Sequence, residues 1–196
     1  KKLNMKILGI GNAIVDVICK VDDSFIEQNN LTKSTMKLFF NENEFKSLLT
    51  NLKIEKTVSG GSVANSIVGL SQLGEKVGFI GKVSDDEFGS KYEEGLKKEN
   101  VEYFYSKKKE ELPTGTCLIL VTPDSERTMC TFLGTAGKIN ENDVDIDVIK
   151  KSEIIFLEGY LWDEGDPKKA FDKAINSANK VAMSLSDQFC VDRHKT

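Results

Sequence analysis

The sequence has few of the residues from which metal sites and disulfide frameworks are built. Its single histidine is His194, and its four cysteines are widely spaced with no C-x-x-C pair. This argues against a metal site or a histidine-based triad within the chain, so no metal ligand is expected. The scattered cysteines indicate reduced thiols, and we therefore expect a cytoplasmic protein.

Long apolar runs and an excess of basic residues are also missing. No stretch approaches the roughly 20 apolar residues that span a bilayer. Residues 1–6 lead into a short apolar run that soon meets Asn12 and Asp16, which is not the pattern of a secretory signal. Lysine and arginine number 27 against 31 acidic residues, a net charge of −4, whereas a nucleic-acid surface would need a basic excess. We expect neither a membrane nor a nucleic acid as a partner.

What the sequence does contain is an alternation of short apolar runs with amphipathic stretches. Buried strands are expected at residues 6–11, 77–80, 154–157 and 181–184. The expected helix caps are Asn41 or Asn43, Ser84 or Asp85, and Asp166 followed by Pro167. Strands that alternate with helices in this way predict an α/β fold made of crossover units.

The middle of the chain departs from this alternation. Residues 116–122 and 127–133 flank the turn sequence of residues 123–126, which predicts an inserted β-hairpin. Together with the alternating strand through Asp16, this hairpin could form a small separate sheet. Arg127 lies in the hairpin and could hold a phosphate or a carboxylate, although a solvent-exposed charge is the simpler interpretation.

A pair of glycines stands at the start of an amphipathic helix, in the stretch Ser59-Gly60-Gly61-Ser62-Val63-Ala64-Asn65. Adjacent glycines let the backbone approach a ligand closely. A helix start offers free N–H groups and a partial positive charge, and Asn65 falls in the first turn. By itself the pattern fits an ordinary tight turn as well as it fits the floor of a pocket for a polar, hydroxyl-bearing molecule.

Polar residues also follow the first expected strand. Asn12 and Asp16 come four residues apart after a strand that ends in glycine, and open α/β sheets place their ligand groups at such strand ends. Residues 9–14 resemble a dinucleotide fingerprint only superficially, because Ile14 replaces the third glycine and a strand-like alternation follows. Glu158 ends another expected strand, at the same edge of the sheet as Asn12.

Four segments, taken in order, resemble the ribokinase/PfkB family of carbohydrate kinases. Within that family they are most similar to adenosine kinases. They are residues 11–16, 60–65, 81–89 and 113–116. No single segment is decisive, but their order is specific, and the resemblance covers nearly the whole chain. It implies a three-layer, Rossmann-like α/β fold with a small β-sheet lid, of which the chain would hold the N-terminal two-thirds. The lid would use residues 14–22, 35–40 and 114–134.

The resemblance also implies a function. Family members transfer the γ-phosphoryl group of ATP, with Mg²⁺, to a primary hydroxyl of a sugar or nucleoside. The residues that would bind the acceptor are Asn12, Asp16, Gly60, Gly61, Ser62, Asn65 and Glu158. Arg127 would be an additional phosphate or substrate contact. Relatives often dimerise through the lid, so a homodimer is expected as well.

The acceptor itself stays open between a nucleoside and a simple sugar. The spacing of Asn12 and Asp16, and Ser62 after the glycines, resemble adenosine kinases. Glu158 instead resembles the strand-end glutamate with which ribokinases contact the sugar. Val63 also stands where the family signature prefers a small residue. We expect a nucleoside-like acceptor, with a ribose- or fructose-type sugar as the alternative.

One feature of the family is absent from the sequence. The family's catalytic base is an aspartate in a Gly-Ala-Gly-Asp-type segment, where a helix start also stabilises the migrating phosphoryl group, and no such segment occurs here. We therefore expect the parent protein to continue beyond Thr196 for roughly another hundred residues. Two alternatives of other classes are a non-catalytic nucleoside- or sugar-binding module and an unrelated α/β scaffold with incidental glycines.

Overall fold

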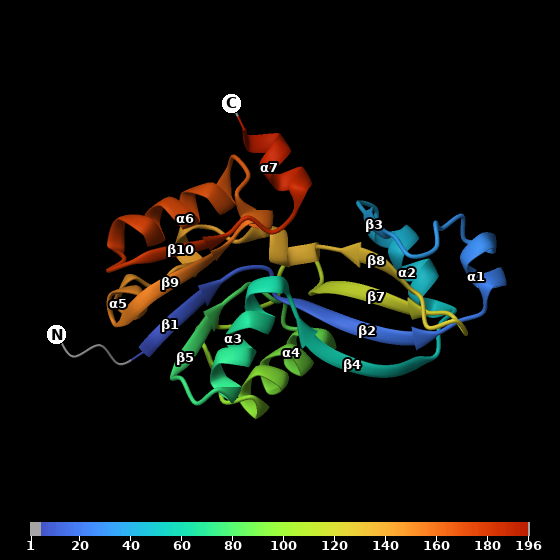
Figure 1. Ribbon diagram of the computed structural model, residues 1–196, viewed down its shortest axis with the longest axis horizontal. Helices are drawn as coiled ribbons and strands as arrows, with labels where there is room; N and C mark the ends of the chain where they lie inside the picture. The colour runs from blue at the N-terminus through green and yellow to red at the C-terminus, as the bar shows by residue number, and fades with distance from the viewer. Residues whose placement is uncertain (1–4, 196) are drawn as a thin grey trace.

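The computed structural model describes residues 5–195, and these residues form two five-stranded sheets that lie side by side (Figure 1). In the first sheet the strand order is β10-β9-β1-β5-β6, and every pair of neighbours is parallel. Its strands are β1 (Met5–Ile10), β5 (Val77–Ile80), β6 (Glu102–Tyr103), β9 (Ser152–Glu158) and β10 (Val181–Ser184).

Helices cover both faces of the first sheet, because its strands carry apolar side chains on both faces. The helices are α3 (Ser62–Gln72) and α4 (Glu87–Lys98) on one side, and α5 (Ile146–Lys150) and α6 (Asp166–Ser177) on the other (Figure 1). Leu8 packs with Phe171 of α6 in one core cluster, whereas Phe79 packs with Ile67 of α3 in the other. Parallel sheets are characteristically buried in this way. The three-layer α/β prediction is confirmed.

The second sheet has the order β3-β8-β7-β2-β4 and mixes parallel and antiparallel pairs. Its strands are β2 (Ile14–Lys20), β3 (Met36–Phe39), β4 (Ile54–Gly60), β7 (Gly115–Val121) and β8 (Arg127–Phe132). It contains the hairpin and both other segments that the sequence suggested for a small sheet. It also contains β4, which leads directly into the glycine pair.

Only one face of the second sheet belongs to the core. Alternate residues such as Val15, Val17 and Leu118 are buried there. They pack in a cluster that includes Ile26 of α1 (Asp23–Gln28) and Phe45 of α2 (Glu42–Thr50). The other face carries no helix among the described residues, and its side chains are partly exposed.

The observed caps confirm the one expected for α2 and correct those expected for α4 and α6. The Asn41 side chain accepts the N–H groups of residues 43 and 44, as expected. Helix α4 is capped by Asp86 rather than Ser84 or Asp85, because the Asp86 carboxylate accepts the N–H of residue 89 and also binds Thr114. Helix α6 is capped by Gly165 rather than Asp166. The chain enters this helix at φ 106°, a conformation that favours glycine.

The remaining elements are short. They are α7 (Gln188–His194) and three turns of 3₁₀ helix, η1 (Gly134–Lys138), η2 (Glu141–Asp143) and η3 (Gly159–Leu161). Across residues 5–195, none of the helices combines the length and the apolar character that crossing a bilayer would require.

The sheets meet at one point that positions the candidate site. The chain passes from the first sheet to the second through residues 11–13, directly after β1, and returns through Gly61 between β4 and α3. Ile14, the first residue of β2, pairs with both Gly60 and Gly115. The near ends of β2, β4 and β7 therefore lie together beside the carboxyl end of β1, where open α/β sheets place ligand groups.

Candidate functional site

The glycine pair lets two polar loops approach the start of α3. Gly61 has φ 105°, and a Cβ atom added there would lie 2.2 Å from the Asn12 carbonyl oxygen. A Cβ atom added to Gly60 would lie 2.5 Å from Oδ2 of Asp16. Real Cβ contacts are not this short, so any larger residue would push the loops apart. The two glycines thus bring Asn12 and Asp16 together at the helix start.

Glu158 lies under the same junction and is saturated with hydrogen bonds. It is 1% exposed at the end of β9, next to β1 in the sheet. The Asn12 Nδ2 and backbone N–H groups donate to its Oε1 at 2.8 and 3.3 Å. The Val63 backbone N–H donates to its Oε2 at 3.1 Å. Burial raises the pKa of this carboxyl, and the polar contacts from Val63, Ser62 and Asn12 oppose that rise.

The Asn12 side chain is left with one unused acceptor. Asn12 is 3% exposed, and its Oδ1 is the only buried side-chain oxygen or nitrogen without a hydrogen-bond partner in the part of the chain that the structure describes. Buried polar atoms nearly always have a partner, so such an atom calls for an explanation. Because the Asn12 backbone lies against Gly61, a ligand donor at the glycine pair is the natural one.

Asp16 has a carboxylate without a hydrogen-bond partner among residues 5–195, on the partly exposed face of the second sheet. Burial raises its pKa from 3.8 to about 6. The strand registers place it in one row with Cys117 of β7 and Val58 of β4. Thr131 of β8 continues the row, and its hydroxyl donates to the Cys117 sulfur at 3.3 Å. A half-buried, unpaired carboxylate is suited to accepting hydroxyl groups from a ligand.

The surroundings of Asp16 are mostly apolar. Side chains two residues apart along a strand share a face, and we call this surface the open face of the second sheet. Its apolar members are Ile14, Ile18, Met36, Leu38, Val58, Ile119 and Met129. Met36, Val58 and Met129 are 40%, 40% and 38% exposed. The open face therefore offers one carboxylate among apolar side chains, with the cations Lys20, Lys56 and Arg127 further from the glycine pair.

The other three candidate residues lie at different distances from this group, and Ser62, which makes a polar contact with Glu158, is the nearest in contact terms. Ser62 and Asn65 are exposed in the first turn of α3. Asn65 lines a groove of about 460 Å³ between β4, α3 and α4. Arg127 is exposed and pairs with Val121, which is six residues along β7 from Gly115, or about 20 Å. The structure does not bring Arg127 to the other candidates.

Sequence reasoning missed a buried tyrosine that supports the glycine pair. Tyr92 of α4 is fully buried, and its hydroxyl donates to the Gly60 carbonyl at 3.2 Å. The Ser59 hydroxyl donates in turn to the Tyr92 carbonyl at 2.9 Å. Helical spacing indicated only that Tyr92 packs inward. Because a buried tyrosine hydroxyl usually finds a partner, its presence in an apolar stripe was the one available signal.

A buried charge cluster near the junction was also missed. Lys82, which follows β5, is 4% exposed and lies 3.1 Å from Asp143 and 3.7 Å from Glu110. The Tyr105 hydroxyl donates to Glu110 at 2.6 Å. These contacts tie the end of β5 to η2 and to the connection that leads into β7. The cluster has no free donor or acceptor that suggests a ligand, so we assign it a structural role.

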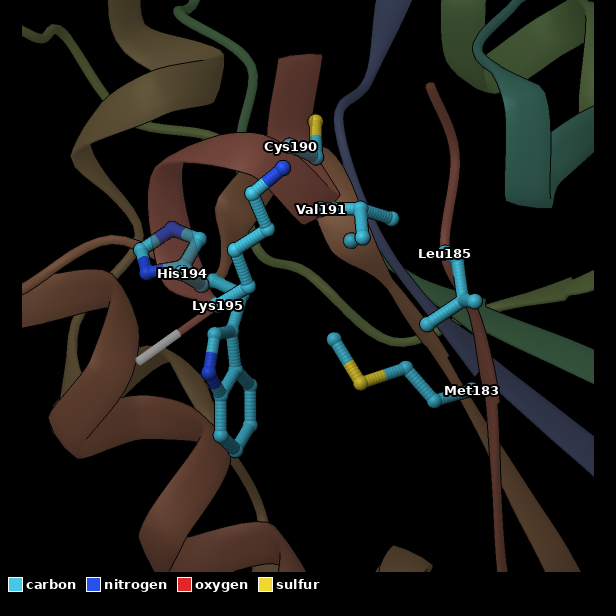
Figure 2. A pocket seen from close by; sticks show the side chains of 8 residues that line it. Met183, Leu185, Cys190, Val191, His194 and Lys195 are labelled. Carbon is cyan, nitrogen blue, oxygen red and sulfur yellow. The ribbon is translucent and has the colours of Figure 1, made fainter. Parts of the chain in front are cut away.

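A separate hollow of about 360 Å³ lies between β10 and α7. Figure 2 shows Met183 and Leu185 on one side of it and Cys190 and Val191 on the other. The lining is largely apolar, and the imidazole of His194 is hydrogen-bonded to Asp163 at 3.2 Å. None of the residues expected to bind an acceptor lines this hollow, so it is not part of the candidate site.

The described residues contain no group of three or more histidine, cysteine or acidic side chains that could hold a metal ion. All four cysteines, Cys19, Cys117, Cys130 and Cys190, are free and buried. No residue of this chain is therefore assigned to a metal.

The family profile described as "pfkB family carbohydrate kinase" matches residues 6–192. The chain belongs to the PfkB family of carbohydrate kinases. This confirms the resemblance and excludes the alternative of an unrelated scaffold. A curated relative, the 5-dehydro-2-deoxygluconokinase of Mesomycoplasma hyopneumoniae, is 30% identical over 152 residues, which is 74% of this chain and 45% of the relative. The chain thus spans less than half the length of that PfkB kinase.

Solved structures of kinases superpose on nearly the whole chain. The adenosine kinase from Sinorhizobium meliloti is 36% identical with a TM-score of 0.85, over 97% of this chain and 59% of that one. A probable sugar kinase from Rhizobium etli is 34% identical with a TM-score of 0.84, over 98% and 59%. The chain is thus similar to kinases named for a nucleoside and for sugars.

Proposed function

We propose that the complete protein to which this chain belongs transfers the γ-phosphoryl group of ATP to a primary hydroxyl of a nucleoside. The observation that carries the proposal is that two residues with unused acceptors lie against the glycine pair: the Asp16 carboxylate faces Gly60, and the backbone of Asn12, whose Oδ1 is unpaired, faces Gly61. Membership of the PfkB family supports phosphoryl transfer in general. Asp16, Asn12 and the backbone of Gly60 and Gly61 hold the acceptor's hydroxyls in this proposal, and Asn65 at the helix start contributes its amide.

The chemistry of these groups suits a polyhydroxylated acceptor. A carboxylate accepts two hydroxyl hydrogens, and an amide oxygen accepts another. A site built in this way rejects analogues that lack the hydroxyl, because the buried acceptor is then left unpaired. Holding the acceptor fixed also supplies much of the rate in phosphoryl transfer, in which positioning and electrostatics dominate.

The open face favours a nucleoside over a simple sugar. A sugar alone would use Asp16 and leave the neighbouring apolar side chains, including Ile14 and Val58, in water. A nucleobase attached to the sugar would cover them and gain the free energy of apolar burial. The second candidate is a simple sugar kinase, which is favoured by the identity to the 5-dehydro-2-deoxygluconokinase.

The phosphate donor and the catalytic base are proposed from family membership alone. ATP and Mg²⁺ are the expected co-substrate and ion, and no residue of this chain is assigned to either. We place the base, an aspartate, in a part of the protein outside these 196 residues. We also keep the cytoplasm as the compartment, and a homodimer through the lid (residues 14–22, 35–40 and 114–134) as a further proposal, to be tested by sedimentation with and without acceptor.

The test is a substrate panel on the complete protein with ATP and Mg²⁺. Adenosine and other nucleosides are compared with ribose, fructose and 5-dehydro-2-deoxygluconate by kcat/KM. A nucleoside should give the highest value. A higher value for a sugar or sugar acid would move the assignment to the second candidate. Calorimetric binding of a nucleoside with no turnover of any acceptor would make the protein a non-catalytic binding module.

A further inference from the structure

Both carboxylate oxygens of Glu158 are already occupied inside the protein. Oε1 accepts two N–H groups of Asn12, and Oε2 accepts the N–H of Val63. The side chain is also almost completely buried. These three N–H groups use three of the roughly four acceptor positions of the carboxylate, so Glu158 has less to offer an acceptor hydroxyl than the unpaired Asn12 Oδ1. Direct contact between Glu158 and the acceptor is therefore disfavoured.

The hydrogen bonds of Glu158 fix which way the Asn12 amide faces. An ionised carboxylate accepts hydrogen bonds and cannot donate them. The NH₂ end of the Asn12 amide must then face Glu158, as the 2.8 Å contact from Nδ2 shows. The oxygen end, Oδ1, is turned away and is the unpaired buried acceptor.

We propose that Glu158 is a positioning residue, which holds the Asn12 amide oxygen ready to accept one hydroxyl hydrogen of the acceptor. The inference rests on the proposed function and deepens it. The Val63 contact adds a second consequence, because it ties the start of α3, and with it the glycine pair, to the same carboxylate. One buried charge thus orients two parts of the acceptor site without touching the acceptor.

This arrangement makes the site selective for a hydrogen-bond donor at one carbon of the acceptor molecule. A hydroxyl satisfies Asn12 Oδ1, whereas a hydrogen or a methoxy group at that carbon leaves it unpaired. The lost hydrogen bond costs up to about tenfold in affinity. The acceptor analogue that lacks this one hydroxyl should therefore bind more weakly than the parent, and the difference should depend on both Asn12 and Glu158.

The first experiment is a double-mutant cycle in the complete protein with Asn12→Ala, Glu158→Gln and the double variant. Glutamine has one acceptor oxygen where glutamate has two, so it cannot accept from both the Asn12 amide and the Val63 N–H, and the fixed arrangement of the site is lost. Each single change should raise the acceptor KM about tenfold, and the double change should raise it no further. Both variants should also lose the discrimination against the deoxy analogue. Glu153→Gln is the matched control, because Glu153 lies on the same strand in an exposed ion pair with Lys6, and its KM should not change.

If the two single effects multiply in the double variant, Glu158 acts on the acceptor independently of Asn12 and the inference is wrong. The second experiment needs no variant and so does not depend on folding of Glu158→Gln. In a crystal structure of the unaltered complete protein with its acceptor, a hydroxyl should lie about 3 Å from Asn12 Oδ1 and none within that distance of Glu158. A hydroxyl on the Glu158 carboxylate would overturn the inference. Failure of the proposed function is seen separately, as absence of turnover by the unaltered protein.

Discussion

The two sheets bury their side chains in different ways. Strands of the first sheet are apolar on both faces, and α3 and α6 cover them from opposite sides. The second sheet buries one face under α1 and α2 and leaves the open face partly exposed. The first sheet therefore supplies most of a conventional three-layer core. The second has one face left for a ligand, at a cost in buried apolar area.

The two sheets also differ in how many hydrogen-bond partners their candidate-site carboxylates have. Glu158 ends a strand of the first sheet and has three hydrogen-bond donors. Asp16 lies on the open face and has no hydrogen-bond partner within residues 5–195, and burial raises its pKa to about 6. A saturated carboxylate organises its surroundings, whereas an unpaired one is available to a ligand. Changes to the two sheets should separate stability from acceptor binding.

The largest expected effect is on the core of the first sheet. Phe171→Ala should lower the free energy of unfolding by about 3–5 kcal/mol, because it removes a fully buried ring and leaves a cavity. Met129→Ala on the open face should cost less than about 1 kcal/mol, because that side chain is already partly in water. Denaturant titration of both variants measures the difference. Equal losses would mean that the open face is covered in solution.

The buried charge cluster around Lys82, near the junction of the two sheets, should affect the free energy of unfolding almost as strongly. Lys82→Met leaves Asp143 as a buried carboxylate without its cation and removes one of two lysines near Glu110, and breaking such a buried pair costs about 3–5 kcal/mol. Lys91→Met is the matched control, since its ion pair with Glu87 is at the surface and such pairs contribute about 0.5 kcal/mol or less. Thermal or chemical denaturation distinguishes the two, and similar small losses would show that the cluster is dispensable.

On the open face, loss of the Asp16 carboxylate should affect binding more than folding. Asp16→Asn keeps the size of the side chain. It removes the negative charge to which, in the proposed function, the hydroxyls of the substrate donate hydrogen bonds. The acceptor KM should rise by about 10- to 100-fold, the range for a hydrogen bond to a charged group. Steady-state kinetics on the complete protein provides the measurement, with Asp22→Asn on an exposed loop as the control. An unchanged KM for every acceptor would remove Asp16 from the site.

The pH dependence of stability is a further test of the open face. Burial raises the folded pKa of Asp16 from 3.8 to about 6, so the native state binds this proton more tightly than the unfolded chain. Its contribution to stability therefore falls as pH rises from about 4 to about 6. Asp16→Asn should match the unaltered protein at the acidic end of this window and be more stable above it. Unfolding free energies at about pH 4, the acidic end of the window, and at about pH 7.5, above it, provide the comparison, and a constant difference would contradict the assignment.

Local features could be predicted from residues that are close in the sequence. Asn41 caps α2, the hairpin forms around residues 123–126, and the glycine pair precedes α3. Each depends on local backbone geometry and on the spacing of apolar residues. The caps of α4 and α6 were each misplaced by one residue. Thr114, which helps to fix Asp86 as the α4 cap, comes from 28 residues further along the chain.

The contacts that define the candidate site could not be predicted in this way. Glu158 lies 146 residues from Asn12 in the chain, and the sequence suggested the same sheet edge but a direct contact with the acceptor. The positions of Cys117 and Thr131 beside Asp16 depend on the register of β2, β7 and β8. The distance of Arg127 from the site depends on the same register.

The sequence by itself determined the alternation of strands and helices, the inserted hairpin and the family, because these depend on periodicity and on short motifs. The tertiary structure decided the order of the strands, which face of the second sheet stays open, and which carboxylate is saturated. A strand presents the same alternation whichever neighbour it pairs with, so only packing of the whole chain selects the partners. That selection separates Glu158, which accepts three hydrogen bonds, from Asp16, which has no hydrogen-bond partner among residues 5–195.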